Sequence, residues 1–189
     1  LTDKDRDYLA CYVPDITYGV NLNLRYKGFE LSMFGQGVTG TMVRFYQEQA
    51  WAFSDNASPR EFHLKRWTVD NPDPNAAYPR IYPRTSTHST FNNKFSDFWL
   101  FDSDYFRIKN ITLGYTLPAV WTKKVLINKA RIYVACENFF TFDKLGGLPI
   151  DAEEISGFSM FNSTNYNSGR TGVGTPTMKN MSVGIQLNF

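Results

Sequence analysis

Residues 180–189 decide the fold; they read Asn180-Met181-Ser182-Val183-Gly184-Ile185-Gln186-Leu187-Asn188-Phe189, and apolar residues alternate with small or polar ones throughout. Successive side chains of a β-strand point to opposite faces, so this alternation predicts a strand with one apolar and one polar face. A soluble sandwich strand has this pattern too. A strand that ends the chain on an aromatic residue favours the closing strand of an outer-membrane β-barrel.

Other stretches repeat the pattern. Residues 16–27 carry a second clean alternation, from Tyr18 to Tyr26 on the apolar side, and residues 110–117 carry a third. A perfect ten-residue alternation arises by chance at roughly one position in a thousand, so two such stretches together with the eight-residue stretch over 110–117 indicate strands. Lys27-Gly28 predicts a two-residue hairpin turn into a strand over 29–36. Further strands are predicted over 105–117 and 130–142. Arg107 and Lys109 share the apolar phase, which predicts a position beyond the lipid or a β-bulge.

Two long segments show no sustained alternation of apolar and polar residues. They are residues 41–104 and 143–175. The first holds five prolines, both histidines and three of the four tryptophans, and we expect it to fold, with a short helix near Phe45–Phe53. If the final strand ends at the periplasmic edge, both long segments lie outside and both short connections lie inside, as in outer-membrane barrels. The sequence therefore predicts an all-β, antiparallel transmembrane barrel segment. Five strands are fewer than the eight of the smallest such barrels, so a larger barrel or an assembly is required.

Composition excludes several classes of protein. The chain has 189 residues, 42% of them hydrophobic and 16% aromatic, and a net charge of +2. It contains no run of 18 apolar residues for a transmembrane helix, no signal peptide and no basic cluster for nucleic acid. Since it starts without Met, we expect it to begin within a longer protein or after a cleavage. Cys11 and Cys136 are expected to be unpaired thiols.

Catalysis finds no support in the sequence. His63 and His88 have no Cys, Asp or Glu at ligand or triad spacing, and we interpret both as surface residues. Asp151, Glu153 and Glu154 lie in a loop rich in Gly and Asn, where a solvated patch is the simpler interpretation. The chain is predicted not to be an enzyme.

The aromatic residues of the long segments are the candidate binding residues. Their rings could stack on sugars or line a peptide channel. The alternative is that they pack the long loops and a partner interface. The candidates are Trp51, Trp67, Trp99 and Tyr166, with Phe98 beside them.

Several runs resemble the late barrel of SusC/RagA-type TonB-dependent transporters of Bacteroidetes. They are Pro14-Asp15-Ile16-Thr17-Tyr18-Gly19-Val20-Asn21-Leu22, Tyr26-Lys27-Gly28-Phe29-Glu30-Leu31, Phe34-Gly35-Gln36-Gly37, Tyr105-Phe106-Arg107-Ile108-Lys109-Asn110-Ile111-Thr112-Leu113-Gly114-Tyr115-Thr116-Leu117-Pro118, and Arg131-Ile132-Tyr133-Val134-Ala135-Cys136-Glu137-Asn138-Phe139-Phe140-Thr141-Phe142. The resemblance implies the last five strands of a barrel of roughly 22 strands with an N-terminal plug. It also implies import of glycans or oligopeptides, driven by the TonB complex through an N-terminal part that this chain lacks. The implied partners are the rest of the barrel and its plug, a SusD-like surface lipoprotein lid, and outer-membrane lipid, with the transporter–lipoprotein pair forming a dimer and no nucleic acid involved.

The resemblance gives each segment of the chain a place. The organisation it implies is an extracellular loop remnant over 1–15, a barrel hairpin over 16–40, a long extracellular loop over 41–104, a barrel hairpin over 105–142, an extracellular loop over 143–175 and a closing strand over 176–189. Thr2 and Asp5 resemble the second half of a calcium loop, with a solvated acidic turn as the alternative. No other cofactor is implied. Phe189 resembles the C-terminal aromatic signal for barrel assembly. The alternative for the whole chain is a soluble or surface-attached all-β structural or adhesive module.

Overall fold

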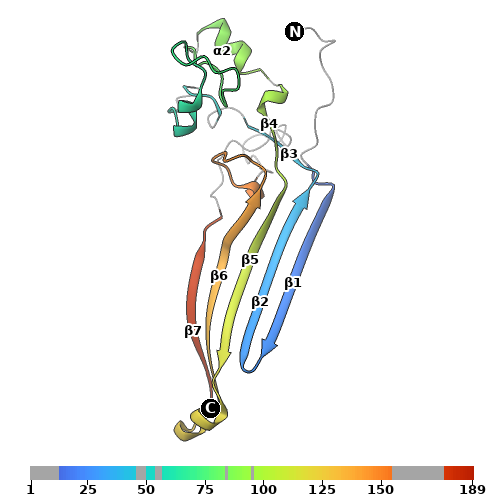
Figure 1. The fold of residues 1–189 in the computed structure, drawn as a ribbon, viewed down its shortest axis with the longest axis vertical. Coiled ribbons are helices and arrows are strands. Elements are labelled where there is room, and N and C mark those ends of the chain that lie inside the picture. The colour runs from blue at the N-terminus through green and yellow to red at the C-terminus, as the bar shows by residue number, and fades with distance from the viewer. Residues whose placement is uncertain (1–12, 46–49, 54–56, 84, 95, 155–176) are drawn as a thin grey trace, which may run out of the picture. The chain divides into compact units, whose positions relative to one another are not determined.

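The computed structural model describes residues 13–45, 50–53, 57–83, 85–94, 96–154 and 177–189 (Figure 1). The chain divides into two compact units. The first, here called the loop unit, comprises Thr41–Ser103 and residues 145–154 among those described. The second, here called the barrel sheet, comprises Pro14–Gly40, Asp104–Lys144 and the C-terminal segment that ends at Phe189.

The barrel sheet has five antiparallel strands in the order β1-β2-β5-β6-β7. Their bounds are Ile16–Tyr26 for β1, Phe29–Thr39 for β2, Tyr105–Thr116 for β5, Lys129–Asp143 for β6 and Asn180–Asn188 for β7. All five predicted strands are present, and each pairs with its neighbour along most of its length. The predicted antiparallel β-sheet fold is therefore confirmed.

The two short connections lie at the same end of the barrel sheet (Figure 1). Lys27 and Gly28 join β1 to β2 with φ angles of 46° and 91°, the two positive values that a primed hairpin turn requires. The connection from β5 to β6 contains the helical turns α3, Ala119–Thr122, and η5, Lys123–Val125. The longer connections, from β2 to β5 and from β6 to β7, both leave from the opposite end.

A β-bulge interrupts β5 at Lys109. In β2, Phe34 pairs with Asn110 and the next residue, Gly35, pairs with Ile108, so Lys109 is the extra residue of β5 at this point. The register also shifts against β6, but there the extra residue lies in β6, since Ile108 pairs with Phe140 and Asn110 with Glu137. The extra residue in β5 shifts the alternation of its side chains, so that residues beyond the bulge change face. Of the two explanations predicted for Arg107, the bulge is the one the structure contains.

The loop unit has its own small core. Its elements are β3, Met42–Arg44, paired with β4, Leu100–Asp102, and the short helices η3, Glu61–Lys65, α2, Thr87–Asn92, η4, Asp97–Trp99, and η6, Ala152–Glu154. The core consists of Phe45, Ala50, Tyr78 and Trp99. Residues 46–49 of the helix predicted near Phe45–Phe53 lie outside the described residues.

Candidate functional site

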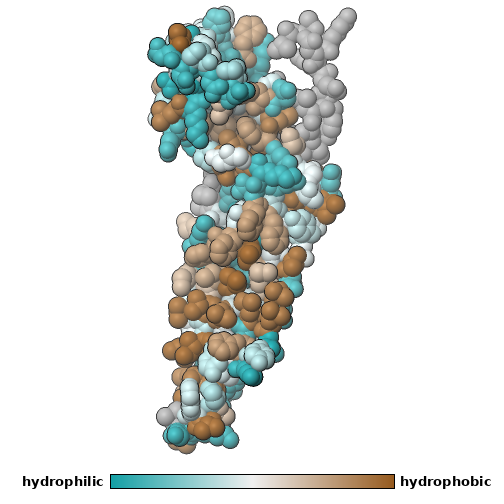
Figure 2. All heavy atoms as spheres, viewed as in Figure 1, coloured by the Kyte–Doolittle hydropathy of each residue, from teal (hydrophilic) through white to brown (hydrophobic). Residues whose placement is uncertain are grey.

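One face of the barrel sheet is apolar across every strand. Because the strands are in register, their apolar residues form straight rows across the sheet. The central row is Leu24, Leu31, Leu113, Val134 and Val183, and rows of the same kind lie on either side of it. Val183 is 68% exposed and Leu24 53% exposed. Figure 2 shows a band of hydrophobic residues across the strands, with more hydrophilic residues toward the strand ends.

The opposite face of the sheet carries polar and charged residues. Glu30 of β2 lies 3.0 Å from the Arg131 Nε atom of β6 and 3.7 Å from the Arg25 Nε atom of β1. The pair between β2 and β6 must cross β5, and it does so at Gly114, where an added Cβ would lie 2.8 Å from the Arg131 guanidinium. A sheet with one apolar and one polar face can separate lipid from an aqueous lumen.

The bulge at Lys109 brings Arg107 onto the polar face. Arg107 is 4% exposed, and its Nε atom donates a hydrogen bond to Thr141 Oγ1 at 2.9 Å. The same change of phase turns Phe106 onto the apolar face, where its ring stacks with that of Tyr18 at a centroid distance of 6.1 Å. Without the bulge, an arginine would project into the apolar face.

The end of the sheet that bears the long connections is tied together by Asp104. Its Oδ2 atom accepts a hydrogen bond from Thr39 Oγ1 at 2.9 Å and lies 2.9 Å from Lys144 Nζ. These contacts join the end of β2, the start of β5 and the end of β6. They stabilise the positions at which the chain enters and leaves the sheet.

The predicted binding aromatics lie in the loop unit, and the structure brings two of them together. Trp99 is 2% exposed in the core, and its ring packs edge-on against that of Trp51 at 6.3 Å. Trp67 is half-buried, and its backbone amide donates to the Tyr78 carbonyl oxygen at 2.9 Å. Tyr166 lies outside the described residues. The burial of Trp99 favours the packing alternative for that residue, while a binding role for Trp51 and Trp67 stays a prediction.

The two histidines differ in environment. His88 is exposed, as predicted, and stacks on Tyr82. His63 is 2% exposed, so the prediction of a surface residue was wrong for it. Its Nδ1 atom accepts a hydrogen bond from the Arg60 amide at 2.8 Å, and Nε2 lies 3.0 Å from the Ala50 carbonyl oxygen. This pairing requires the neutral tautomer with the proton on Nε2. Both ring nitrogens are used structurally.

The Ala50 carbonyl oxygen also accepts a hydrogen bond from the Tyr78 hydroxyl. Burial raises the pKa of Tyr78 to about 12, an effect only partly opposed by a backbone hydrogen bond. Tyr78 and His63 therefore hold one carbonyl from two directions.

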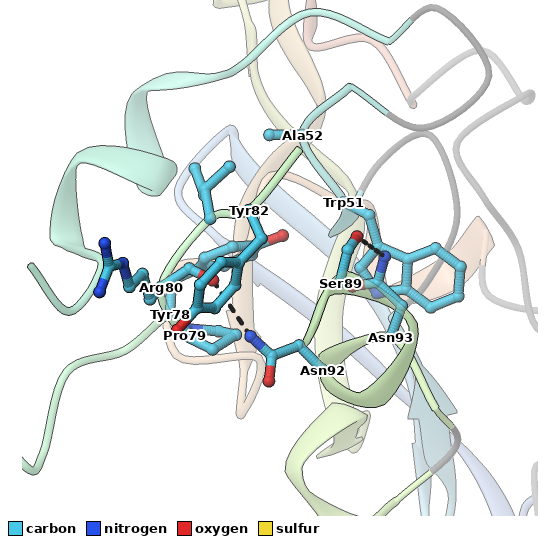
Figure 3. Close-up of a pocket in the computed structure, with 10 residues that line it drawn as sticks. Trp51, Ala52, Tyr78, Pro79, Arg80, Tyr82, Ser89, Asn92 and Asn93 are labelled. Carbon is cyan, nitrogen blue, oxygen red and sulfur yellow. Dashed lines mark hydrogen bonds between the residues drawn. The ribbon is translucent and has the colours of Figure 1, made fainter. Parts of the chain in front are cut away.

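A small pocket opens beside this core (Figure 3). It encloses about 20 Å³, room for about one water molecule, and so does not hold a sugar ring. Asn92 donates to the Arg80 carbonyl oxygen at 3.1 Å across the pocket. The Arg80 guanidinium extends away from Asn92, and it lies 6.0 Å from the Trp67 ring centroid and 5.1 Å from that of Tyr82.

Sequence reasoning missed Arg80 and the Glu30–Arg131 pair. Arg80 precedes Tyr82 in a segment rich in proline, where no periodicity indicates which rings it approaches. The ion pair depends on the register between strands that are separated by the whole loop unit. A correct strand order would have placed Glu30 opposite Gly114 and so within reach of Arg131.

The remaining candidate residues are separate from these features. Thr2 and Asp5, the predicted calcium ligands, lie outside the described residues, as does Cys11. In the part of the chain that is described, no group of three His, Cys, Asp or Glu residues could hold a metal ion. Cys136 is a free thiol in the apolar rows. Asp151 accepts a hydrogen bond from the Glu153 amide at 3.0 Å, which is a local turn contact. No described helix has the length and apolar character to span a bilayer.

Comparison with known proteins identifies a single class. No family model matches the chain. Two curated proteins of Formosa agariphila align with the whole chain: TonB-dependent receptor P3, 24% identical over 194 residues, and TonB-dependent receptor P26, 20% identical over 200 residues. The solved structure of the RagAB peptide transporter matches 95% of the chain with a TM-score of 0.61 and 25% identity.

The curated relatives are TonB-dependent receptors, and the sheet shares the barrel fold of the RagAB transporter. Within that class, the resemblance to SusC/RagA-type transporters is confirmed. The chain spans 18% of the length of each of these proteins. The described sheet is therefore an antiparallel transmembrane β-barrel segment.

Proposed function

We propose that this chain forms part of a SusC-like TonB-dependent transporter in a bacterial outer membrane. The complete protein imports oligopeptides or glycans, with a SusD-like lipoprotein as its lid. The observation that carries the proposal is the apolar face, which runs unbroken over five strands opposite a face that bears ion pairs. A bilayer requires this separation, since a spanning sheet must present apolar side chains to lipid.

The polar face supports an aqueous or plug-filled lumen. The Arg25–Glu30–Arg131 cluster leaves each charge with an opposite partner on the same face. The similarity to a protein described as a peptide transporter supports oligopeptides over glycans as the cargo. The loop unit, whose half-buried Trp51 and Trp67 keep part of their rings accessible, supplies a surface for cargo or for the lid.

A pair of arginine substitutions tests the two faces in the full-length protein. Val183→Arg places a charge on the apolar face near its centre and should destabilise the folded barrel by about 2–4 kcal/mol. Gln186→Arg is the matched control on the same strand, three residues away on the polar face, and should change stability little. The measurement is the midpoint of urea unfolding in lipid vesicles. Equal effects of both substitutions would contradict the barrel, as would an isolated chain that stays folded in water without detergent.

Cargo and energy source have a direct test. Mass spectrometry of molecules retained by the purified full complex identifies the cargo, and uptake of that cargo by cells should be lost when TonB is deleted. Uptake that persists without TonB would contradict the transport mechanism.

The aromatic residue Phe189 is proposed as the signal for barrel assembly. Phe189 is 78% exposed, so its removal costs little internal packing. Deletion of Phe189 from the full-length protein should lower the fraction inserted into the outer membrane, with deletion of an exposed loop residue as the control. Unchanged insertion would exclude this role.

A further inference from the structure

The connection between β5 and β6, residues 117–128, exposes large apolar side chains. Val120 is 72% exposed, Trp121 61% and Leu126 87%. The connection is nevertheless well folded. Thr122 is buried, the Ile127 amide donates to the Thr122 carbonyl at 3.1 Å, and the Asn128 amide donates to the Asn188 carbonyl of β7 at 2.8 Å. The apolar side chains are thus held outward by an ordered backbone.

The backbone at Leu126 makes this exposure more informative. Leu126 adopts a left-handed conformation with φ 59°, a region in which Gly or Asn is favoured and a leucine is strained. In a turn that faces water, Gly or Asn at this position would give an unstrained backbone and a well-hydrated surface. With leucine at this position the backbone is strained, and the side chain is left uncovered by the rest of the chain. Contact with an apolar phase outside the chain offsets both costs.

The same end of the sheet is strongly basic. Lys27 lies in the β1–β2 turn, Lys123 and Lys124 in η5, and Lys129 at the start of β6, all exposed. Among the residues that the structure describes, no ion pair involves Lys123, Lys124 or Lys129. Glu30, the acidic residue closest to this end, already pairs with Arg131 and Arg25. The opposite end of the sheet carries the acidic residues Asp104 and Asp143 instead.

The apolar face of the sheet extends to the end that bears this connection. The last full row of the apolar face before the connection is Tyr26, Phe29, Tyr115, Ile132 and Ile185. Trp and Tyr favour the membrane–water interface, and lysines beside them are attracted to anionic headgroups. Apolar insertion beside basic residues is the pattern of segments that lie in the interface plane.

We propose that the connection over residues 117–128 docks on the bilayer interface and binds anionic phospholipid headgroups. Val120, Trp121 and Leu126 enter the headgroup layer, and Lys123 and Lys124 contact the phosphates. The inference rests on the proposed function, because it requires the sheet to span a membrane. It adds a specific lipid-binding element and a preference for negatively charged lipid.

Quenching of Trp121 by brominated lipid tests the docking. The full-length protein is reconstituted in nanodiscs that contain 30% phosphatidylglycerol in phosphatidylcholine, and either lipid is supplied in brominated form at the same mole fraction. The fluorescence of Trp121 is taken as the difference between the wild type and Trp121→Phe. We expect brominated lipid to quench Trp121, with brominated phosphatidylglycerol quenching more per molecule.

A double substitution tests the lysines. Lys123→Gln with Lys124→Gln should remove most of the preference for phosphatidylglycerol, which we expect to fall by roughly fivefold for each lysine. Lys65→Gln with Lys94→Gln makes the same charge change in the loop unit and should leave the preference unchanged. Leu126→Asn relaxes the backbone, so it should weaken quenching by lipid without lowering the unfolding midpoint in detergent.

The outcomes separate this inference from the proposed function. A protein that inserts into nanodiscs but whose Trp121 is quenched by aqueous iodide and not by brominated lipid overturns the inference alone. Equal quenching by the two brominated lipids in the wild type overturns the preference for anionic lipid. A protein that fails to insert overturns both proposals together.

Discussion

The loop unit and the barrel sheet place their apolar residues in opposite ways. In the loop unit, Phe45, Tyr78 and Trp99 are at most 5% exposed and pack against each other. In the barrel sheet, Val183 and Ile185 are both 68% exposed, and Leu24 and Leu113 are both 53% exposed. The loop unit thus buries its apolar side chains in an internal core, whereas the barrel sheet presents them on one outer face.

The difference shows which forces stabilise each unit. The loop unit depends on burial of its own aromatic side chains, as soluble domains do. The sheet gains little from burial within itself, and its strands depend on backbone hydrogen bonds and on the membrane that covers the apolar rows. Damage to one unit should therefore leave the other largely intact.

The largest effect is expected in the core of the loop unit. Trp99→Ala removes a buried ring that packs on Trp51 and Tyr78, so the loop unit should lose about 3–5 kcal/mol. Hydrogen exchange on the full-length protein should show faster exchange over residues 41–103 and unchanged exchange in β5 and β6. Phe98→Ala, at a residue that is 47% exposed, is the control. Equally faster exchange in the strands would show that the two units are not independent.

Within the sheet, a substitution at the close contact of Gly184 should give the second-largest loss of stability. An added Cβ there would lie 2.4 Å from Tyr133 Cζ, so Gly184→Ala must displace the Tyr133 ring and should cost about 1–3 kcal/mol. Ser182→Ala, on the same face of β7, is the control. The measurement is the urea midpoint in vesicles. A neutral Gly184→Ala would show that the polar face is not packed as described.

Alkaline pH should destabilise the loop unit selectively. The pKa of Tyr78 is raised from 10.0 to about 12 in the fold, so the stability this residue contributes is complete below pH 10 and is lost as pH rises through 12. The free energy of unfolding should fall by roughly 1–2 kcal/mol. The measurement compares the pH dependence of unfolding, followed by near-ultraviolet circular dichroism, in the wild type and in Tyr78→Phe. Identical pH profiles for the two proteins would contradict the role of burial.

The smallest effect is expected on the polar face. Glu30→Gln removes the partner of Arg131 at a position where both side chains are about a quarter exposed, so the cost should be at most about 1 kcal/mol. Glu61→Gln, at an exposed position of the loop unit, should cost less. A loss above 3 kcal/mol in urea unfolding would show that the pair is buried in the complete protein.

The sequence predicted the sheet well because the relevant signal is local. Alternation along 16–26 and 180–188 identifies both the strands and their faces from neighbouring residues alone. The upper half of β2 was predicted only to Gln36, because Gly35 and Gly37 break the apolar phase. The structure shows why the strand continues: Phe106 covers Gly35 and Tyr18 covers Gly37, so neighbouring strands supply the apolar surface.

The loop unit was predicted poorly because its contacts are distant in sequence. Its core joins Phe45, Tyr78, Trp99 and Leu148, and no short-range period connects them. The same cause explains the error at His63, whose Nε2 atom contacts the carbonyl oxygen of Ala50, 13 residues away in a core that the local sequence does not reveal. The candidate binding residues depend on this unit, so their environment could not be predicted either.

The pairing of β3 with β4 also bears on how fast the sheet can form. The Ser103 amide donates to the Thr41 carbonyl at 3.0 Å, so the two ends of the loop unit are held side by side. β2 and β5 must otherwise find each other across roughly sixty residues, at a loop-closure cost about 2 kcal/mol above that of a four-residue loop. A loop unit that folds first removes this entropy cost. The pairing of β2 with β5 then resembles the closing of a short hairpin, which is faster than pairing across a long unfolded loop.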